Sequence, residues 1–169
     1  MYRLDDFYDL SATLTDYPVT RLIGTGVGNE YNQTLSQWVR QDVLDELYHC
    51  FSQLERNNDG QVCPQALRHQ LLSNEKYGPI ARNIIKMWYL SIWYKMTDNW
   101  SMTYGIPAYS SPVIGVESPT PEDYIISNNA YIQGLVWPLM GSHPMGAKQP
   151  GYGTWSDAPL NSIASIHLQ

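Results

Sequence analysis

Few residues of this chain stand in patterns that could do chemistry, and no pattern is complete. A glycine run at residues 24–28 (Gly-Thr-Gly-Val-Gly) is similar to a phosphate-binding loop, in which glycines let the backbone approach a pyrophosphate. It lacks the preceding strand and the spacing of a dinucleotide-binding loop, so we interpret it as close helix packing. Residues 55–60 resemble the first half of a calcium loop, but Ala66 stands where the bidentate glutamate is needed. We therefore expect a turn there.

The two cysteines do not point to a metal. Cys50 and Cys63 form no CxxC pair, and we expect His49 and His69 to lie beside different helical faces, so a four-ligand zinc set does not assemble. An even cysteine count allows one disulfide in an exported protein and equally allows two inert thiols. Both alternatives remain open from the sequence.

His143 stands alone in the segment Ser142-His143-Pro144-Met145-Gly146. A histidine among proline and glycine is more often a loop or interface residue than a catalytic base. Members of a catalytic triad meet in space, so no triad can be named from the sequence. We predict no catalytic residue. The alternative is a small enzyme that uses His143 or His49 with a nearby carboxylate.

Composition excludes several classes of partner. The 169 residues carry 16 acidic and 10 basic side chains, with no Lys/Arg cluster, so we do not expect binding to nucleic acid. The longest apolar stretch, residues 84–93, is short and contains Lys86, so we do not expect insertion into a membrane. The 13 Tyr and 6 Trp against 2 Phe indicate either a protein-facing surface or a core rich in Tyr and Trp.

Apolar residues spaced three and four apart predict helices in the first hundred residues. The expected helices cover residues 4–16, 19–38, 42–54, 64–72 and 80–96. Aromatic residues follow the last of them at roughly helical spacing and favour a core position: Trp88, Tyr89, Trp93, Tyr94 and Trp100. The fold class is therefore all-α.

From residue 99 onward, frequent proline and glycine predict long irregular segments. One helix is expected within them, with Thr120 as N-cap and Pro121, Glu122 and Asp123 in its first turn, running to about Leu135. We predict a single domain over residues 1–169: a small helical part at about 1–98 and an extended arm at about 99–169.

The aromatic side chains of this arm have little secondary structure to bury them, so a partner surface is their expected place. The candidate partner interface consists of Tyr104, Tyr109, Trp137, His143, Pro150, Tyr152 and Trp155.

Several segments, in order along most of the chain, match a known family. They are the helix at residues 4–14 ending in Asp16-Tyr17, the continuation Leu22-Ile23-Gly24, the helix with Met87-Trp88-Tyr89-Leu90, and the closing Gln149-Pro150-Gly151-Tyr152-Gly153-Thr154-Trp155 with Ala158-Pro159. The chain thereby resembles the small, gamma-type subunit of bacterial membrane-bound, FAD-dependent sorbitol, fructose and glucose dehydrogenases. No single segment is specific to that family, but their combination is.

The resemblance implies a mainly helical, non-catalytic subunit that holds a large flavoprotein of the glucose-methanol-choline type. That partner binds FAD and oxidises CH–OH groups of sugars or polyols, often beside a cytochrome c subunit, while the small subunit binds no cofactor. The family's small subunit acts as a chaperone and typically carries a twin-arginine export signal that takes both chains to the periplasm.

Two features depart from the family. The export signal is not in the sequence, so we expect a mature form and a periplasmic location. Some relatives place a cysteine in the arm, whereas residues 142–155 contain none, which puts a covalent link to the large subunit in doubt. The remaining alternative is a stand-alone carbohydrate-binding module that uses exposed Trp and Tyr rings.

Overall fold

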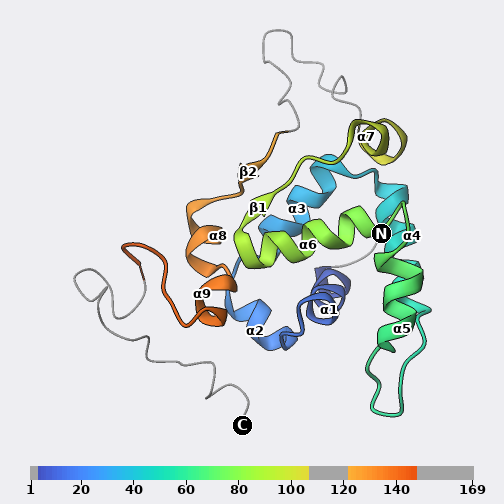
Figure 1. Cartoon of the computed structure of the whole chain (residues 1–169), viewed down its shortest axis with the longest axis horizontal. Helices are drawn as coiled ribbons and strands as arrows, with labels where there is room; N and C mark the ends of the chain where they lie inside the picture. The colour runs from blue at the N-terminus through green and yellow to red at the C-terminus, as the bar shows by residue number, and fades with distance from the viewer. Residues whose placement is uncertain (1–3, 107–121, 148–169) are drawn as a thin grey trace.

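The computed structural model describes residues 4–106 and 122–147, and these fold mainly into helices, as the sequence predicted (Figure 1). The helices are α1 (Leu4–Thr15), α2 (Val19–Gly24), α3 (Gly28–Trp38), α4 (Gln41–Ser52), α5 (Pro64–Ala66) with a π-helical continuation (Leu67–Leu72), α6 (Gly78–Leu90), α7 (Asp98–Tyr104), α8 (Asn128–Gln133) and α9 (Val136–Leu139). Two short strands, β1 (Ile92–Trp93) and β2 (Tyr124–Ile125), pair antiparallel.

The core forms around Trp88, which lies on α6 and is fully buried. Phe7 and Tyr8 of α1 and Tyr31 of α3 surround its indole, with ring centroids 6.2, 6.3 and 4.9 Å away. Aromatic pairs at these distances add to the free energy gained by burying their surface. Trp93 and Trp100 are also buried, which confirms that the Trp residues of this stripe belong to the core.

The glycine run divides the second predicted helix in two. The prediction of a single helix over residues 19–38 was wrong, because α2 ends at Gly24 and α3 begins at Gly28. Between them Gly26 has a φ of +73°, which a side chain disfavours. A Cβ on Gly28 would lie 2.3 Å from the Tyr8 hydroxyl oxygen, so the interpretation of close helix packing is confirmed at Gly28.

The helix predicted to run to residue 96 ends at Leu90. Ser91 takes a left-handed conformation with a φ of +62°, and the chain continues as β1. Ile92 pairs with Ile125 and Trp93 with Tyr124. The cause is a partner distant in the sequence, which helical spacing does not reveal.

The helix predicted from Thr120 is also wrong in its start. Tyr124 and Ile125 are extended, because they pair with β1. The helix begins at Asn128, where the Ser127 hydroxyl accepts a hydrogen bond from the Ala130 amide and so caps it. The strand and the helices α8 and α9 lie within the region expected to be an irregular arm.

The turn predicted at residues 55–60 is confirmed. The Asn57 side-chain oxygen accepts hydrogen bonds from the amides of Asp59 and Gln61, at 3.1 and 2.9 Å. Gly60 has a φ of +77°, and the Arg56–Val62 bridge closes the loop. Such a side-chain-bonded turn needs no ion.

Within residues 4–106 and 122–147, no helix has the length and apolar character needed to cross a membrane.

The close contact at Gly28 gives a direct test of this packing. Gly28→Ala should lower the free energy of unfolding by about 1–3 kcal/mol, because Tyr8 is buried and its ring has little room to move. Gly24→Ala is the matched control: a Cβ there meets nothing within 4 Å, so it should be neutral or mildly stabilising. Urea unfolding measures both; equal stabilities would contradict the packing at Gly28.

Candidate protein-interaction surface

Most of the large exposed apolar side chains come from elements that lie on the same side of the molecule (Figure 1). Of the seven large, exposed hydrophobic side chains among the described residues, six come from α2, the end of α6, β2, and α9 with the loop after it. Figure 1 shows these elements on one side, on the left. We call these six residues the apolar end: Ile23, Leu90, Ile125, Leu139, Met140 and Met145.

Main-chain bonds to the last turn of α6 hold these elements in place. The Leu135 amide donates to the Trp88 carbonyl at 2.9 Å, and the Ile126 amide donates to the Ser91 carbonyl at 3.0 Å. The buried Ser91 hydroxyl donates to the Ala130 carbonyl at 2.6 Å. Bonds to buried partners of this kind are costly to lose, so the segment from Ile126 to Leu135 is fixed to α6.

A close approach completes this attachment. A Cβ on Gly134 would lie 3.0 Å from the Tyr89 carbonyl oxygen and 3.2 Å from the Ser91 hydroxyl. Only a residue without a side chain lets the α8–α9 connection come this near to α6. A cleft of about 290 Å³ lies between α2 and this connection.

Trp137, a residue of α9, packs against Tyr131 of α8. Its indole N–H donates to the Tyr131 carbonyl at 2.7 Å, and the two rings meet edge to face at 5.2 Å. The following loop turns at Gly141 and Gly146, which have φ values of +62° and +71°. Trp137 is therefore half-buried, and the side chains that α9 and its loop expose are Leu139, Met140 and Met145.

The other predicted interface residues are dispersed. His143 is half-buried in the loop after α9, with Nδ1 3.2 Å from the Pro144 carbonyl oxygen. Tyr104 ends α7, away from α9 (Figure 1), where it packs on Trp100 at 5.6 Å. The structure brings Trp137 and His143 into one segment but not Tyr104. The predicted residues Tyr109, Pro150, Tyr152 and Trp155 lie outside the described residues.

Sequence reasoning missed the aliphatic and methionine side chains of the apolar end. Leu139 and Met140 carry no clear signal of exposure, because they follow Leu135 and Val136 at helical spacing. Ile23 and Leu90 carry no such signal, since each lies within a helical pattern whose other members are buried.

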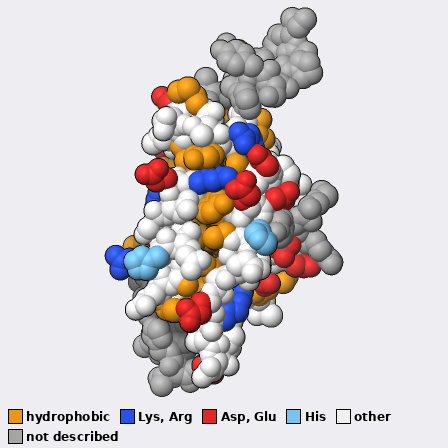
Figure 2. All heavy atoms as spheres, turned by 90° about the vertical axis from the view of Figure 1, so that its right-hand side faces the viewer, with side chains coloured by type: hydrophobic (Ala, Val, Ile, Leu, Met, Phe, Trp, Pro, Cys, Tyr) orange, Lys and Arg blue, Asp and Glu red, His pale blue; other side chains and the backbone are white. Residues whose placement is uncertain are grey.

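The opposite side of the molecule has a different character. Figure 2 shows the face that carries α4 and α5, where acidic and basic side chains are interspersed along a narrow band of hydrophobic ones. A shallow hollow of about 400 Å³ lies on this face, lined by Asp45, Glu46, His49, Cys50 and Tyr77.

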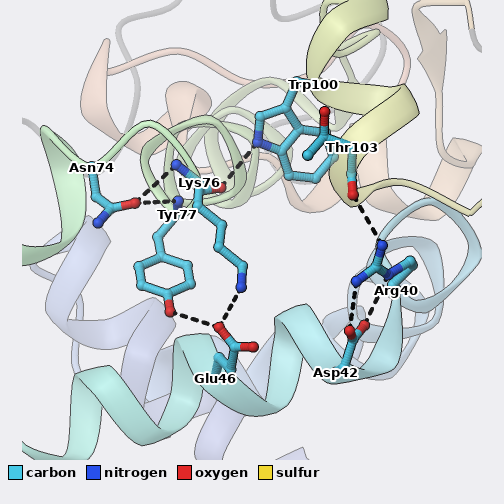
Figure 3. A network of polar contacts seen from close by, with 8 residues as sticks. All are labelled: Arg40, Asp42, Glu46, Asn74, Lys76, Tyr77, Trp100 and Thr103. Atoms are coloured by element: carbon cyan, nitrogen blue, oxygen red, sulfur yellow. Dashed lines mark hydrogen bonds and ion pairs between the residues drawn. The ribbon is translucent and has the colours of Figure 1, made fainter.

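A polar network joins α4 to the loop before α6 and to α7 (Figure 3). Glu46 accepts hydrogen bonds from the Lys76 ammonium and, at 3.1 Å, from the Tyr77 hydroxyl. The Asn74 side chain accepts from the amides of Lys76 and Tyr77, and the Trp100 indole donates to the Lys76 carbonyl at 3.0 Å. These contacts fix Trp100, and with it Tyr104, inside the domain.

A second contact secures α7 from its other end. Arg40 forms a two-bond ion pair with Asp42 and donates to the Thr103 carbonyl at 2.9 Å (Figure 3). The Arg40 guanidinium lowers the pKa of the Asp42 carboxyl to about 2. The partial burial of Tyr104 is therefore an internal structural feature.

Both cysteines are free thiols in the structure. The Cys50 sulfur lies 4.0 Å from the Gln70 carbonyl oxygen, and burial raises the pKa of its thiol. Of the two alternatives left open by the sequence, the structure has the unbridged one.

In the part of the chain that the structure describes, no three His, Cys, Asp or Glu side chains are grouped so that they could hold a metal ion.

The charge on Glu46 gives the network a pH dependence. Lys76, and then Tyr77, lower the pKa of Glu46 below its ordinary 4.5. Because the folded pKa is the lower one, the carboxylate stabilises the fold above pH 4.5, and this contribution is lost as the pH falls through the lowered pKa. Wild type should therefore exceed Glu46→Gln in unfolding free energy near neutral pH, and the difference should vanish in acid.

Lys76→Met is the companion variant, since it removes the main cause of the shift. NMR titration should find the Glu46 pKa closer to 4.5 in that variant. An unchanged Glu46 pKa, or a wild-type advantage that persists at low pH, would contradict the assignment.

Comparison with protein-family models, with curated proteins and with solved structures finds no match to this chain. The resemblance to dehydrogenase small subunits therefore remains an expectation that depends on the residues quoted for it.

Proposed function

We propose that this chain is the non-catalytic small subunit of a heteromeric, FAD-dependent sugar or polyol dehydrogenase, and that it binds the catalytic flavoprotein through its apolar end. The observation that carries this proposal is the exposure of six large aliphatic and methionine side chains on elements that lie on one side of the molecule (Figure 1). Exposed apolar side chains that gather in one region are typical of protein-interaction sites.

The chemistry of these side chains suits a protein partner. Met140 and Met145 expose 70% and 72% of their surface. Removing apolar surface from water gains about 25 cal/mol per Å² before the entropic cost of association, and the flexible thioether of methionine adapts to the shape of a partner. Methionine is also enriched in protein interfaces relative to the remaining surface.

The position of the apolar end along the chain supports the same partner. Met145 stands four residues before the Gln149–Trp155 stretch, which carries part of the resemblance to dehydrogenase small subunits. The part of the apolar end that comes from α9 and its loop is therefore close to that stretch in sequence. In this proposal the partner holds FAD and oxidises the CH–OH group, and a cytochrome c subunit is a further possible partner.

The proposed role of the small subunit is to cover an apolar surface of the flavoprotein during folding and to accompany it to the periplasm. A chain that binds the folded partner stabilises it by mass action. No cofactor and no catalytic residue in this chain is part of the proposal.

The carbohydrate-binding alternative requires exposed aromatic rings on which a sugar can stack. Among the described residues, the large hydrophobic side chains that are exposed are Ile, Leu and Met, and every Trp, Tyr and Phe is buried or half-buried. The described surface therefore favours a protein partner over a saccharide.

The test is co-expression with the flavoprotein encoded beside this chain, followed by size-exclusion chromatography and a dye-linked sugar oxidation assay. Wild type should co-elute with FAD and activity. Met140→Glu/Met145→Glu should lower the complex yield at least tenfold, because two carboxylates would be desolvated in the interface.

Met102→Glu is the control, since Met102 is 81% exposed but lies on α7, away from the apolar end. It should leave the yield unchanged. Full complex yield with the double variant would overturn the proposed surface, and failure of wild type to co-elute with the flavoprotein would overturn the proposed function.

A further inference from the structure

A second surface feature, a groove of about 520 Å³, lies between α1 and the turn at residues 56–62. Asp9, Ala12 and Asp16 line it from α1, and Arg56 lines it from the turn. This volume is within the range of binding clefts in proteins. No residue of the apolar end lines the groove.

The groove lining is mixed, and its apolar part comes mainly from three aliphatic side chains and one aromatic ring. Val19, Val62 and Leu67 line it, each half-buried and packed against the core. The Phe51 ring lies beneath, buried, with the Arg56 guanidinium carbon 5.6 Å from its centroid. Since Arg56 covers that ring, it does not offer a free aromatic face for stacking on a sugar.

The α1 wall is acidic at both ends. Asp9 lies on α1, Asp16 directly follows its last residue, and both are exposed. The Asp16 amide still donates to the Ala12 carbonyl, so the two residues are about 10 Å apart along the helix axis. Between them the wall is low, with Ala12 and Thr13. Arg56 donates to the Gly60 carbonyl at 3.0 Å, and within the described residues neither aspartate carboxylate has a hydrogen-bond or ion-pair partner.

We propose that this groove binds a helical segment of another protein, apolar on one face and with basic side chains about two turns apart along one edge. The basic side chains would pair with Asp9 and Asp16, and the apolar face would cover Val19, Val62 and Leu67. This inference does not depend on the proposed dehydrogenase partner.

The groove favours a helix over an extended strand. The amides and carbonyls of α1 bond within the helix, and the turn is closed by its own Arg56–Val62 bridge. The α1 wall therefore offers no main-chain edge to which a strand could be added. The small Ala12 at the centre of the α1 wall permits a second helix to approach closely.

The test uses a fluorescein-labelled amphipathic peptide of 18 residues, with leucine along one face and two lysines seven residues apart at its edge. Fluorescence anisotropy should detect binding to the full chain. A peptide with glutamate in place of lysine should bind at least threefold more weakly. Asp9→Asn/Asp16→Asn should weaken binding of the lysine peptide by about threefold or more.

The asparagine variants are chosen to keep the fold. Asp16 has a φ of +60°, a conformation that asparagine also tolerates, and Asp9 is an exposed helical residue. Glu75→Gln/Glu122→Gln is the matched control, since it removes the same charge from exposed residues outside the groove. It should not change the affinity.

The affinity of the single variant Asp9→Asn is compared with that of Glu75→Gln. Because Asp9→Asn leaves the end of α1 unchanged, a loss of affinity in it is an effect on binding. Absence of binding by the lysine peptide, or equal weakening in both double variants, would overturn the proposal. The flavoprotein plays no part in this assay, so its outcome is independent of the proposed function.

Discussion

The turn at the end of α6 is the constraint on which the rest of the structure depends. Ser91, 1% exposed and at a φ of +62°, redirects the chain from α6 into β1. Its hydroxyl donates a hydrogen bond to the Ala130 carbonyl, and its carbonyl accepts one from the Ile126 amide. The nearby Trp88 carbonyl accepts a hydrogen bond from the Leu135 amide. The same α6 carries the Trp88 ring at the centre of the core, so one helix joins the buried aromatic cluster to the apolar end.

The parts of the fold that sequence predicted are those whose cause is local. α1 and α4 follow from apolar residues three and four apart, because each helix buries one stripe. The failures involve distant partners, although the glycines that divide residues 19–38 are visible in the sequence. Gly28 begins a new helix where it meets Tyr8 of α1, and residues 124–125 become a strand because β1 lies beside them. Single-chain periodicity contains no information on such partners.

The candidate surface was predictable only in part, for the same reason. The sequence prediction had named the region of Trp137 and His143, because it is an aromatic-rich segment with many prolines. The rings themselves pack inward, Trp137 on Tyr131 and Tyr104 on Trp100, and the residues left exposed beside Trp137 are Leu139 and Met140. Which side of a short helix faces solvent depends on where α6 holds it. The proposed interface is thus a consequence of the α6 turn.

The measurement that tests this account most directly is amide hydrogen exchange of Ser91→Ala against wild type. Loss of the buried hydroxyl leaves the Ala130 carbonyl without its donor, which costs about 1–3 kcal/mol. Protection of the Ile126 and Leu135 amides should therefore fall about tenfold or more, while that of Leu44 in α4 should change less. Ser36→Ala, which removes an exposed bond within α3, is the control. Unchanged protection at Ile126 and Leu135 would contradict the central role of the α6 turn.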